Sequence, residues 1–365
     1  MNKQYKVTMR QEQPLTVASF FCGCGGSDLG ILGDFEFLGQ RYPKLPVKIN
    51  YAVDFDKYAV ETYNANFSHH AICADIKDVV LDDIPDFDVL VGGFPCQSFS
   101  TVNPTKDTND DRANLYKELV RALTLKQPKF FIFENVKGLM TLQKGEILKK
   151  VINEFEAVGY HVKYKLLLAS DYGIPQKRER VFIVGIRHDL DIDYEFPEPT
   201  HSENPSLGKK LWQPLKSVVK SLEIDEKKYY FSQKAVDGMK NAKKNMKRGL
   251  YQDLDGQCLT ITSHLAKSSL NSRDPVLLVD PENEVYRRFT PTEASAIQSF
   301  PNEFVFPVSD HQAYRQIGNA IPPVLMWHVA KALMELNKDQ PPKQESCKKN
   351  DKPLKLSSAF AEELA

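Results

Sequence analysis

The sequence predicts an α/β fold, in which a parallel sheet covered by helices on both faces is followed by a smaller, irregular region. Two observations support this prediction. Short apolar runs alternate with helical stretches over the first half of the chain, a pattern typical of parallel sheets. After His188 the alternation stops, and residues 191–285 are richer in Lys, Pro, Ser and Asn.

The first half of the chain supplies the predicted sheet and its helices. Residues 16–21 form a buried apolar run that breaks into a glycine cluster, and a helix is expected from about Asp28. Further strands are predicted at residues 49–53, 71–73, 87–91, 130–133, 163–168 and 180–186. Further helices are predicted at residues 57–66, 115–126 and 145–158.

The second half is predicted to be less regular before it turns helical again. Weak strand patterns occur at residues 229–231, 258–262 and 276–279. Helices are expected within residues 288–301 and, begun by Pro322-Pro323, over residues 322–337. From Lys338 the composition predicts a disordered tail.

Composition limits the class of protein. A chain of 365 residues can bury a large core, and 42% apolar with 26% charged residues is ordinary for a soluble globular protein. No apolar run has the length needed to cross a bilayer, and residues 1–16 are too polar for a secretory signal. Six scattered cysteines favour a reducing compartment, the cytosol. Cys22-x-Cys24 lacks a second ligand pair, so no metal is expected.

Charge is balanced overall but uneven along the chain. The net charge is zero, which is not the basic signature of many nucleic-acid binders. Residues 209–248 nevertheless contain twelve Lys or Arg against four Asp or Glu, whereas residues 75–88 contain six Asp and one Lys. The first segment could face phosphate, although a solvated Lys-rich surface is the commoner meaning of such a run.

Polar groups recur just after the predicted strands. They lie at residues 23–26, 54, 75, 95–97 and 134–136. Ligands of open α/β sheets bind at the carboxyl ends of the strands, so these groups are expected to converge on one crevice.

A glycine cluster and two aspartates predict a cofactor pocket. Phe21-x-Gly23-x-Gly25-Gly26 lets the backbone approach a ligand closely, although glycines alone fit any tight turn. Asp54 after the second strand can bind both ribose hydroxyls, and Asp75 can accept from an adenine amino group. A nucleoside-containing cofactor is therefore expected, either a dinucleotide or S-adenosylmethionine.

The most informative segment is Gly92-Gly93-Phe94-Pro95-Cys96-Gln97-Ser98-Phe99-Ser100. A lone free cysteine is usually a buried structural residue. Here, however, Glu134-Asn135-Val136 also follows an apolar strand, and Arg178 and Arg180 occupy alternate positions that point to one face. A thiolate, a carboxylic acid and a guanidinium together suit methyl transfer to carbon 5 of cytosine.

The chemistry explains this choice of groups. Carbon 5 of cytosine is too poor a nucleophile to attack a methyl sulfonium, but thiolate addition to carbon 6 converts the ring into an enamine. That addition requires a proton at N3, which a carboxyl of raised pKa can supply. An arginine can hold the O2 oxygen and orient the acid.

In order and spacing these motifs resemble the cytosine-C5 DNA methyltransferases, over roughly residues 16–335 with interruptions. Two later segments share the resemblance. Arg287-Arg288-Phe289-Thr290 through Gln298-Ser299-Phe300-Pro301 matches the part that organises the recognition domain. Gln316-Ile317-Gly318-Asn319-Ala320-Ile321-Pro322-Pro323 matches the last motif, whose helix packs beside the first.

The resemblance implies a Rossmann-like, S-adenosylmethionine-dependent methyltransferase domain with a smaller, irregular target-recognition domain. We assign residues 1–190 with 314–337 to the first, residues 191–284 to the second, residues 285–313 to a hinge and residues 338–365 to the tail. Cys96 would be the nucleophile and Glu134 the N3 acid, with Arg178 and Arg180 supporting substrate and acid. The residues that would bind S-adenosyl-L-methionine are Phe21, Gly23, Cys24, Gly26, Asp54, Phe55, Asp75, Ile76, Pro95, Leu115 and Asn319.

Several positions depart from the family pattern. Asp54 stands where the family usually has Glu, and it lies farther from the glycines, so that residues 34–48 are interpreted as a loop insertion. Ala113 replaces a common Gly, and Thr292 and Ala296 replace arginines of the recognition-supporting segment. None of these touches the predicted chemistry directly.

Double-stranded DNA is the partner that the resemblance implies. Carbon 6 of a stacked cytosine is out of reach, so the base must leave the helix, and residues 98–111 would form a mobile loop that closes over the DNA. The candidates for phosphate contact are Lys209, Lys210, Lys243, Lys244, Lys247 and Arg248. Weaker candidates for base-edge contact are Gln252, Gln257, Thr260, Thr262, Ser263 and His264.

The setting favoured by the resemblance is a monomeric bacterial enzyme of a restriction-modification system. It would act in the cytoplasm on nucleoid DNA, with a separate cognate endonuclease. An RNA cytosine methyltransferase is an alternative with the same catalytic groups, and a catalytically silent DNA-binding relative is disfavoured by the intact Cys96-Glu134-Arg180 set. A dinucleotide oxidoreductase would leave Pro95-Cys96-Gln97 unused.

Overall fold

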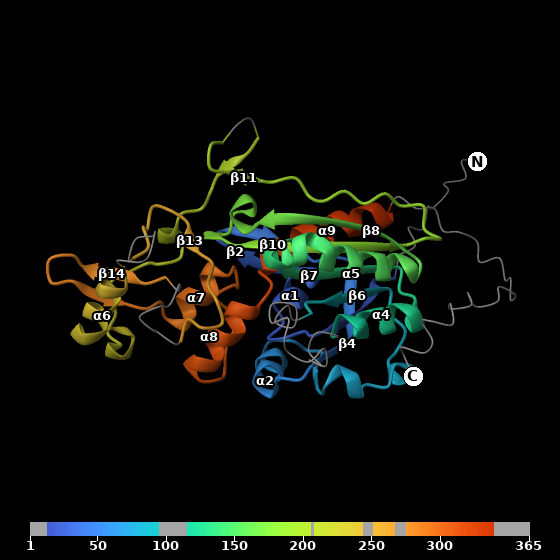
Figure 1. The fold of residues 1–365 in the computed structure, drawn as a ribbon, viewed down its shortest axis with the longest axis horizontal. Coiled ribbons are helices and arrows are strands. Elements are labelled where there is room, and N and C mark those ends of the chain that lie inside the picture. The colour runs from blue at the N-terminus through green and yellow to red at the C-terminus, as the bar shows by residue number, and fades with distance from the viewer. Residues whose placement is uncertain (1–12, 95–114, 206–207, 244–250, 267–274, 339–365) are drawn as a thin grey trace, which may run out of the picture.

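The computed structural model describes residues 13–94, 115–205, 208–243, 251–266 and 275–338. A seven-stranded sheet with the order β5-β4-β1-β6-β7-β10-β8 forms the larger lobe (Figure 1). Its strands are β1 Leu15–Phe20, β4 Val47–Asp54, β5 Ile72–Cys73, β6 Val89–Gly92, β7 Phe130–Val136, β8 Tyr160–Leu168 and β10 Glu179–Arg187. The predicted α/β class is confirmed.

One strand departs from the predicted parallel arrangement. The pairs β5–β4, β4–β1, β1–β6 and β6–β7 are parallel, whereas β10 runs antiparallel to both β7 and β8. The start of β10 therefore lies at the carboxyl end of β7, with Arg180 opposite Val136. This reversal brings the predicted arginines to the edge of the sheet where the other polar groups gather.

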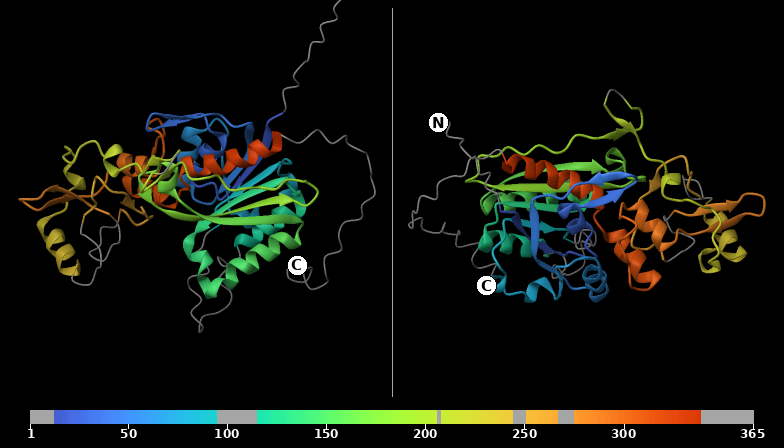
Figure 2. Two further views of the ribbon diagram at one scale, coloured as in Figure 1. Left: turned by 90° about the horizontal axis from the view of Figure 1, so that it is seen from above. Right: turned by 180° about the vertical axis from the view of Figure 1, so that it is seen from behind.

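Helices cover both faces of the sheet, as predicted (Figure 2). One face packs against α1 (Gly26–Leu32) and α9 (Pro323–Lys338), and the other against α4 (Leu115–Lys126) and α5 (Glu146–Ala157). Successive strand residues serve opposite faces, since Val89 and Val91 join one core cluster and Leu90 joins the other. This two-sided burial explains why the strands are continuous apolar runs.

Helix α2 (Lys57–Asn66) and the shorter helices fill the connections of the larger lobe. The Asp56 side chain caps α2 by accepting from the Tyr58 N–H at 3.0 Å. Short 3₁₀ turns are η1 Ile76–Asp78, η2 Leu81–Asp83, η4 Lys137–Met140, η5 Leu142–Gly145 and η6 Ala169–Tyr172.

The loop insertion expected at residues 34–48 is wrong in one respect, because much of it is a packed β-hairpin. Strands β2 (Phe35–Phe37) and β3 (Gln40–Tyr42) pair, and the remainder leads directly into β4. The Trp327 indole donates to Pro43 O at 2.9 Å, so the hairpin is fixed to α9. Phe35, Phe37 and Tyr42 are buried in the core beside α9, which anchors the hairpin.

The smaller lobe is irregular, as expected, but it contains helices that the sequence did not predict. Its elements are β11 His201–Ser202, β12 Lys210–Leu211, η7 Leu215–Ser217, η8 Lys227–Tyr229, α6 Gln233–Lys243, β13 Cys258–Leu259, β14 Leu277–Asp280, β15 Val285–Arg287, α7 Pro291–Ile297 and α8 Asp310–Asn319. Helices α6 and α8 were missed. The strand expected at 229–231 is instead the end of η8 and one bridge between Tyr230 and Arg287.

The two lobes share more of the chain than a simple division suggests. Tyr194 Oη donates to Val329 O at 3.3 Å, and Tyr172 Oη donates to Pro197 O at 2.8 Å. These contacts hold the chain beyond residue 191 against the larger lobe. At the other side, the boundary between residues 313 and 314 falls inside α8.

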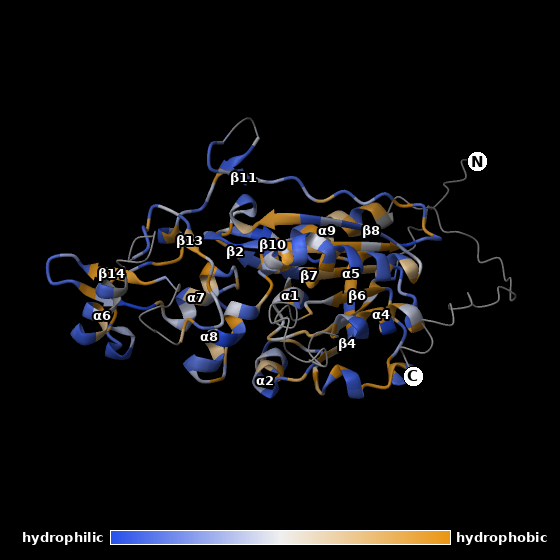
Figure 3. Cartoon of the chain, viewed as in Figure 1, coloured by the Kyte–Doolittle hydropathy of each residue, from blue (hydrophilic) through white to orange (hydrophobic). Residues whose placement is uncertain are grey.

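Hydrophobic residues concentrate in the strands of the sheet, and hydrophilic ones on the connecting loops (Figure 3). No helix within the described ranges combines the length and apolarity needed to cross a bilayer.

Candidate active site

The turn after β1 requires its glycines. Gly23 and Gly25 have φ of 55° and 96°, in the left-handed region that favours glycine. A Cβ at Gly25 would lie 2.2 Å from the Phe67 ring, and one at Gly26 would lie 2.5 Å from Ile321 O. A Cβ at Gly23 would meet no described atom within 4 Å, so this glycine borders open space. Gly26 thus serves the packing of the last motif against α1, while Gly23 faces the predicted cofactor pocket.

Asp54 lies at the end of β4 and holds this turn in place. Its Oδ2 accepts from the Gly23 N–H at 2.8 Å, and its Oδ1 accepts from the Asp56 N–H at 2.8 Å. Burial raises the pKa of the carboxyl above its ordinary value, and these two N–H groups offset part of the rise. Each carboxylate oxygen can accept a second donor, so hydroxyl binding remains open to it.

The remaining predicted cofactor residues within the described chain differ in their exposure. Phe55 follows Asp54 with 73% of its surface exposed, which is unusual for an aromatic ring and leaves a face free for stacking. Asp75 is exposed, and Ile76 behind it is buried. Phe21 and Leu115 are half-buried and Asn319 is exposed at the end of α8. Cys24 is buried, and burial raises the pKa of its thiol to about 12.

A buried carboxylate beneath the turn escaped the sequence analysis. Asp28, in the first turn of α1, accepts hydrogen bonds from Ser19 Oγ (2.6 Å), Ser27 Oγ (2.9 Å) and Tyr63 Oη (2.7 Å). It therefore joins β1, α1 and α2 around the pocket. An acidic residue in a first helical turn is common for reasons of the helix dipole alone, so the sequence carried no signal for this network.

Glu134 and Arg180 form the centre of the site. The Glu134 carboxylate is 8% exposed at the end of β7, and Arg180 Nε lies 2.7 Å from its Oε1. Among the described residues no donor is aligned on that oxygen, so the contact is an ion pair that leaves an acceptor site available. Burial raises the pKa of Glu134 above its ordinary value, and the charges of Arg180 and Arg178 offset part of the rise.

Arg178 is fully buried, and its guanidinium group donates hydrogen bonds to backbone carbonyl oxygens. Its Nη1 donates to Ile261 O at 2.9 Å, and its Nη2 donates to Gly318 O and Ala320 O, both at 3.0 Å. Its charge still acts on the Glu134 carboxyl. Arg178 therefore joins the smaller lobe and the last motif beside the acid.

Gly93 and Phe94, from which the chain continues to Cys96, lie beside Glu134 and Asn135. The Asn135 side chain donates to Phe94 O at 2.9 Å, and a Cβ at Gly93 would lie 3.7 Å from Glu134 Oε2. The end of β6, which leads into the predicted nucleophile segment, is thereby held beside the acid. The role of Asn135 was not predicted, although the residue is in the motif.

Several predicted residues fall outside the described part of the chain. These are Pro95, Cys96, Lys244, Lys247 and Arg248. Lys243 ends α6. Lys209 and Lys210 lie at β12, far along the chain from α6. Thr260 Oγ1 donates to Lys177 O at 2.9 Å, and Gln257 Nε2 donates to Gln213 O, so part of their hydrogen-bonding capacity is used within the protein.

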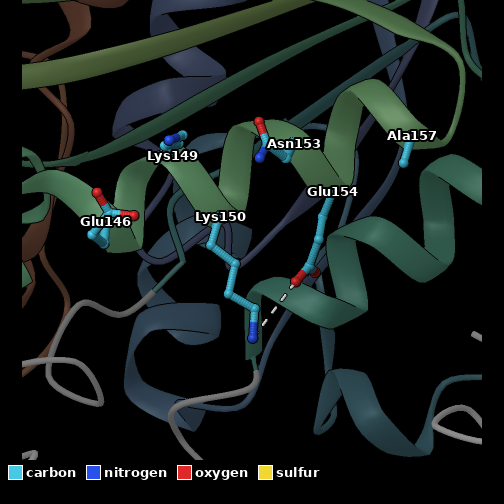
Figure 4. Close-up of a pocket in the computed structure, with 6 residues that line it drawn as sticks. All are labelled: Glu146, Lys149, Lys150, Asn153, Glu154 and Ala157. Atoms are coloured by element: carbon cyan, nitrogen blue, oxygen red, sulfur yellow. Dashed lines mark ion pairs between the residues drawn. The ribbon is translucent and has the colours of Figure 1, made fainter.

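A separate hollow lies away from these groups. Figure 4 shows it along α5, where an ion pair of 3.9 Å joins Lys150 and Glu154. All of its lining comes from this one helix, namely Glu146, Lys149, Lys150, Asn153, Glu154 and Ala157. It contains none of the predicted site residues. Within the described ranges, no three His, Cys, Asp or Glu side chains gather as a metal site requires.

The C-5 cytosine-specific DNA methylase family matches residues 15–335. The chain belongs to this family. Among its relatives, the Type II methyltransferase M.BsuRI of Bacillus subtilis is 35% identical over 364 residues, covering 89% of this chain and 80% of the relative. M.NlaX of Neisseria lactamica is 34% identical over 313 residues, covering 84% of this chain and 91% of the relative.

Solved structures show the same fold. The S. pombe Dnmt2 methyltransferase has a TM-score of 0.68 at 18% identity, covering 90% of this chain and 100% of that one. The Entamoeba histolytica methyltransferase EhMeth has a TM-score of 0.67 at 18% identity, covering 89% and 99%. Family membership makes this protein a DNA cytosine-5-methyltransferase that uses S-adenosyl-L-methionine. The resemblance predicted from the motifs is confirmed.

Proposed function

We propose that this methylase modifies one cytosine within a specific duplex sequence, through a covalent adduct between Cys96 and a base that has left the helix. The observation that supports the proposal is the buried Glu134 carboxyl. It is paired with Arg180 and lies beside the end of β6, where the chain continues to Cys96. A carboxylic acid acting at N3 and a thiolate acting at carbon 6 work on the same ring.

The proposed reaction uses these groups in sequence. The Cys96 thiolate adds to carbon 6 and the Glu134 carboxyl gives its proton to N3, so the C5=C6 electrons shift to C4=C5 and the ring becomes a neutral enamine with a nucleophilic carbon 5. After carbon 5 has accepted the methyl group, a base removes the carbon-5 proton. The electrons of that C–H bond re-form the C5=C6 double bond and expel the Cys96 thiolate, and the proton on N3 returns to the Glu134 carboxylate. Arg180 orients the acid and can hold the O2 oxygen.

The environment of Glu134 suits this role. Because burial raises its pKa, the carboxyl retains its proton to higher pH than an exposed glutamic acid does. Among the described cysteines, Cys22, Cys24 and Cys258 are poorly suited to attack, since each is buried and burial raises the pKa of each thiol.

The strand ends fit the cofactor. Four features match a nucleoside with a ribose and an adenine. They are the open space at Gly23, the Asp54 carboxylate with its two accepting oxygens, the exposed Phe55 ring and the exposed Asp75. S-adenosyl-L-methionine, when bound, supplies the methyl group. We assign its binding to these residues with Phe21, Cys24, Gly26, Ile76, Pro95, Leu115 and Asn319.

Residues of the smaller lobe are proposed to recognise DNA. Taking a cytosine out of the stack costs a few kcal/mol, which protein contacts to the backbone must offset. The Lys-rich segment 209–248 is our candidate for phosphate contact, and residues 252–264 for base contact. We further propose that the enzyme acts as a monomer, with a cognate endonuclease acting separately.

The experiment uses the full chain, tritiated S-adenosyl-L-methionine and duplex DNA, followed by bisulfite sequencing to locate the modified base. We expect label on one cytosine of a fixed sequence. Label on RNA alone, on adenine or on neither nucleic acid would refute the proposal. Cys96→Ser should abolish turnover while equilibrium binding of the cofactor stays unchanged. Residual turnover in this variant would contradict the role of Cys96.

A further inference from the structure

Ile261 of the smaller lobe is held at both of its peptide groups. Its N–H donates to Gln176 Oε1 at 2.9 Å, and its C=O accepts from Arg178 Nη1 at 2.9 Å. Gln176 and Arg178 are 0% and 1% exposed, and both precede β10. Buried polar groups of this kind fix one geometry, because a displaced partner leaves an unpaired group in a dry environment.

A third side chain closes the contact. Gln176 Nε2 donates to Gln298 Oε1 at 2.7 Å, and Gln298 Nε2 donates to Ala320 O at 2.7 Å. Arg178 Nη2 reaches the same carbonyl, Ala320 O, at 3.0 Å. We call Gln176, Arg178 and Gln298 the Ile261 clamp. It joins the smaller lobe, the helix α7 region and the last motif through one set of hydrogen bonds.

The backbone beside the clamp is fixed in the same way. Strand β9 (Gln176–Lys177) pairs in parallel with β13, with Cys258 opposite Gln176 and Leu259 opposite Lys177. Backbone pairing and side-chain hydrogen bonds therefore both join residues 258–261 to residues 176–178.

The clamp also leads to the acid. Arg178 directly precedes β10 and Arg180 is the second residue of that strand, and Arg180 Nε lies 2.7 Å from Glu134 Oε1. The clamp therefore connects residues 258–261 to the strand that carries the arginine beside the acid.

We propose that Gln176 is a positioning residue that couples recognition of the target sequence to the Glu134–Arg180 pair through the Ile261 clamp. The proposal rests on the proposed role of the smaller lobe in DNA recognition. Contacts between the correct DNA sequence and residues 252–264 then stabilise the clamp in the geometry that supports catalysis. Part of the binding free energy thereby lowers the activation free energy of methyl transfer. Without Gln176 the correct sequence still binds, but it no longer accelerates the chemical step.

The test compares Gln176→Met with wild type. The probes are a synthetic duplex carrying the site found by bisulfite sequencing and the same duplex with one base pair of that site replaced, away from the target cytosine. Methylation kcat and KM are measured for both duplexes, and cofactor affinity by equilibrium binding. The matched control is Gln127→Met, since Gln127 Nε2 also makes two hydrogen bonds, to Leu123 O and Val158 O, at the other end of the sheet.

We expect the preference of Gln176→Met for the correct duplex to fall about tenfold, the loss that follows when a buried hydrogen-bond partner is removed. The fall should lie in kcat on the correct duplex, with cofactor affinity unchanged and with Gln127→Met like wild type. An equal loss on both duplexes, or no loss on either, would overturn the coupling. If Gln176→Met does not fold, Gln298→Met weakens the same clamp and carries the same expectations. Failure of wild type to methylate DNA would instead refute the proposed function.

Discussion

Gly318 offers the sharpest test of how closely the two lobes fit. It lies in the last turn of α8, where a Cβ would come within 2.2 Å of both Ser263 N and Thr262 C. Both neighbours are backbone atoms, so they cannot rotate away. To regain an ordinary contact of 3.4 Å, residues 262 and 263 must retreat by about 1 Å.

The two contributions to stability have opposite signs, which makes Gly318→Ala informative. Helix propensity alone predicts that alanine stabilises α8 by about 1 kcal/mol. Overpacking of a fitted contact costs about 3 kcal/mol at the upper end of its usual range. Because the neighbours are backbone, we expect the upper end to apply, for a net loss of about 2 kcal/mol in the free energy of unfolding. The retreat also strains the adjacent hydrogen bond from Arg178 to Ile261 O, so methylation should fall as well.

Urea unfolding and DNA methylation of purified Gly318→Ala check this expectation. The control is Gly256→Ala in the same lobe, where the nearest atom to a Cβ, Asp253 Oδ2, lies at an ordinary 3.5 Å. An unfolding midpoint at or above that of wild type, with full activity, would show that propensity dominates and that the lobes do not meet as described.

Three further predictions concern single buried groups. Glu134→Gln should lower the single-turnover rate about 100-fold to 10,000-fold. Because burial raises the pKa of Glu134, the wild-type rate should decline as pH rises through that pKa. A variant whose pH profile kept this decline would show that another group causes the decline. Asp28→Ala leaves three hydroxyls without their acceptor and should cost about 3 kcal/mol in urea unfolding, more than Asp28→Asn does; equal losses would show that the hydrogen bonds are not the cause. Arg287→Met leaves the Glu293 carboxylate without its two 2.7 Å contacts to Arg287. The free energy of unfolding, measured with heat or urea, should fall by about 3–5 kcal/mol. A loss below about 1 kcal/mol would contradict that pairing.

The larger lobe could be predicted from the sequence because its signals are local. Helices expected at residues 57–66 and 115–126 match α2 and α4, whose apolar residues recur on one face. Gly and Asp residues mark the ends of several strands in the sequence. Because parallel strands share one carboxyl edge, this pattern predicted that the candidate cofactor residues lie at the same edge of the sheet.

Other elements were missed because they are short and mostly polar. Helix α8 has ten residues, and only Ala313, Tyr314 and Ile317 are buried apolar side chains, so its composition resembles that of a loop. Helix α6 is similarly polar. The hairpin at residues 35–42 was taken for a loop because its three-residue strands are too short to show alternation.

The motifs of the site could be recognised in the sequence, but the contacts that support them could not. Glu134 and Arg180 stand in recognisable motifs, whereas the hydrogen bond between Gln176 and Gln298 spans 122 positions. No local sequence pattern indicates which two buried amide side chains form a hydrogen bond with each other. The direction of β10 was equally hidden, because hydrophobicity shows that a strand exists and not which way it runs.

Attack by the Cys96 sulfur on the pyrimidine ring is the central chemical claim, and trapping tests it most directly. Duplexes with 5-fluoro-2′-deoxycytidine at the modified position replace the carbon-5 proton with fluorine, which a base cannot remove, so the adduct cannot resolve. With S-adenosyl-L-methionine present, we expect a protein–DNA complex that survives denaturing electrophoresis and whose attachment maps by mass spectrometry to Cys96. A well-folded, active enzyme that forms no such complex, or that is attached through another residue, would contradict the account.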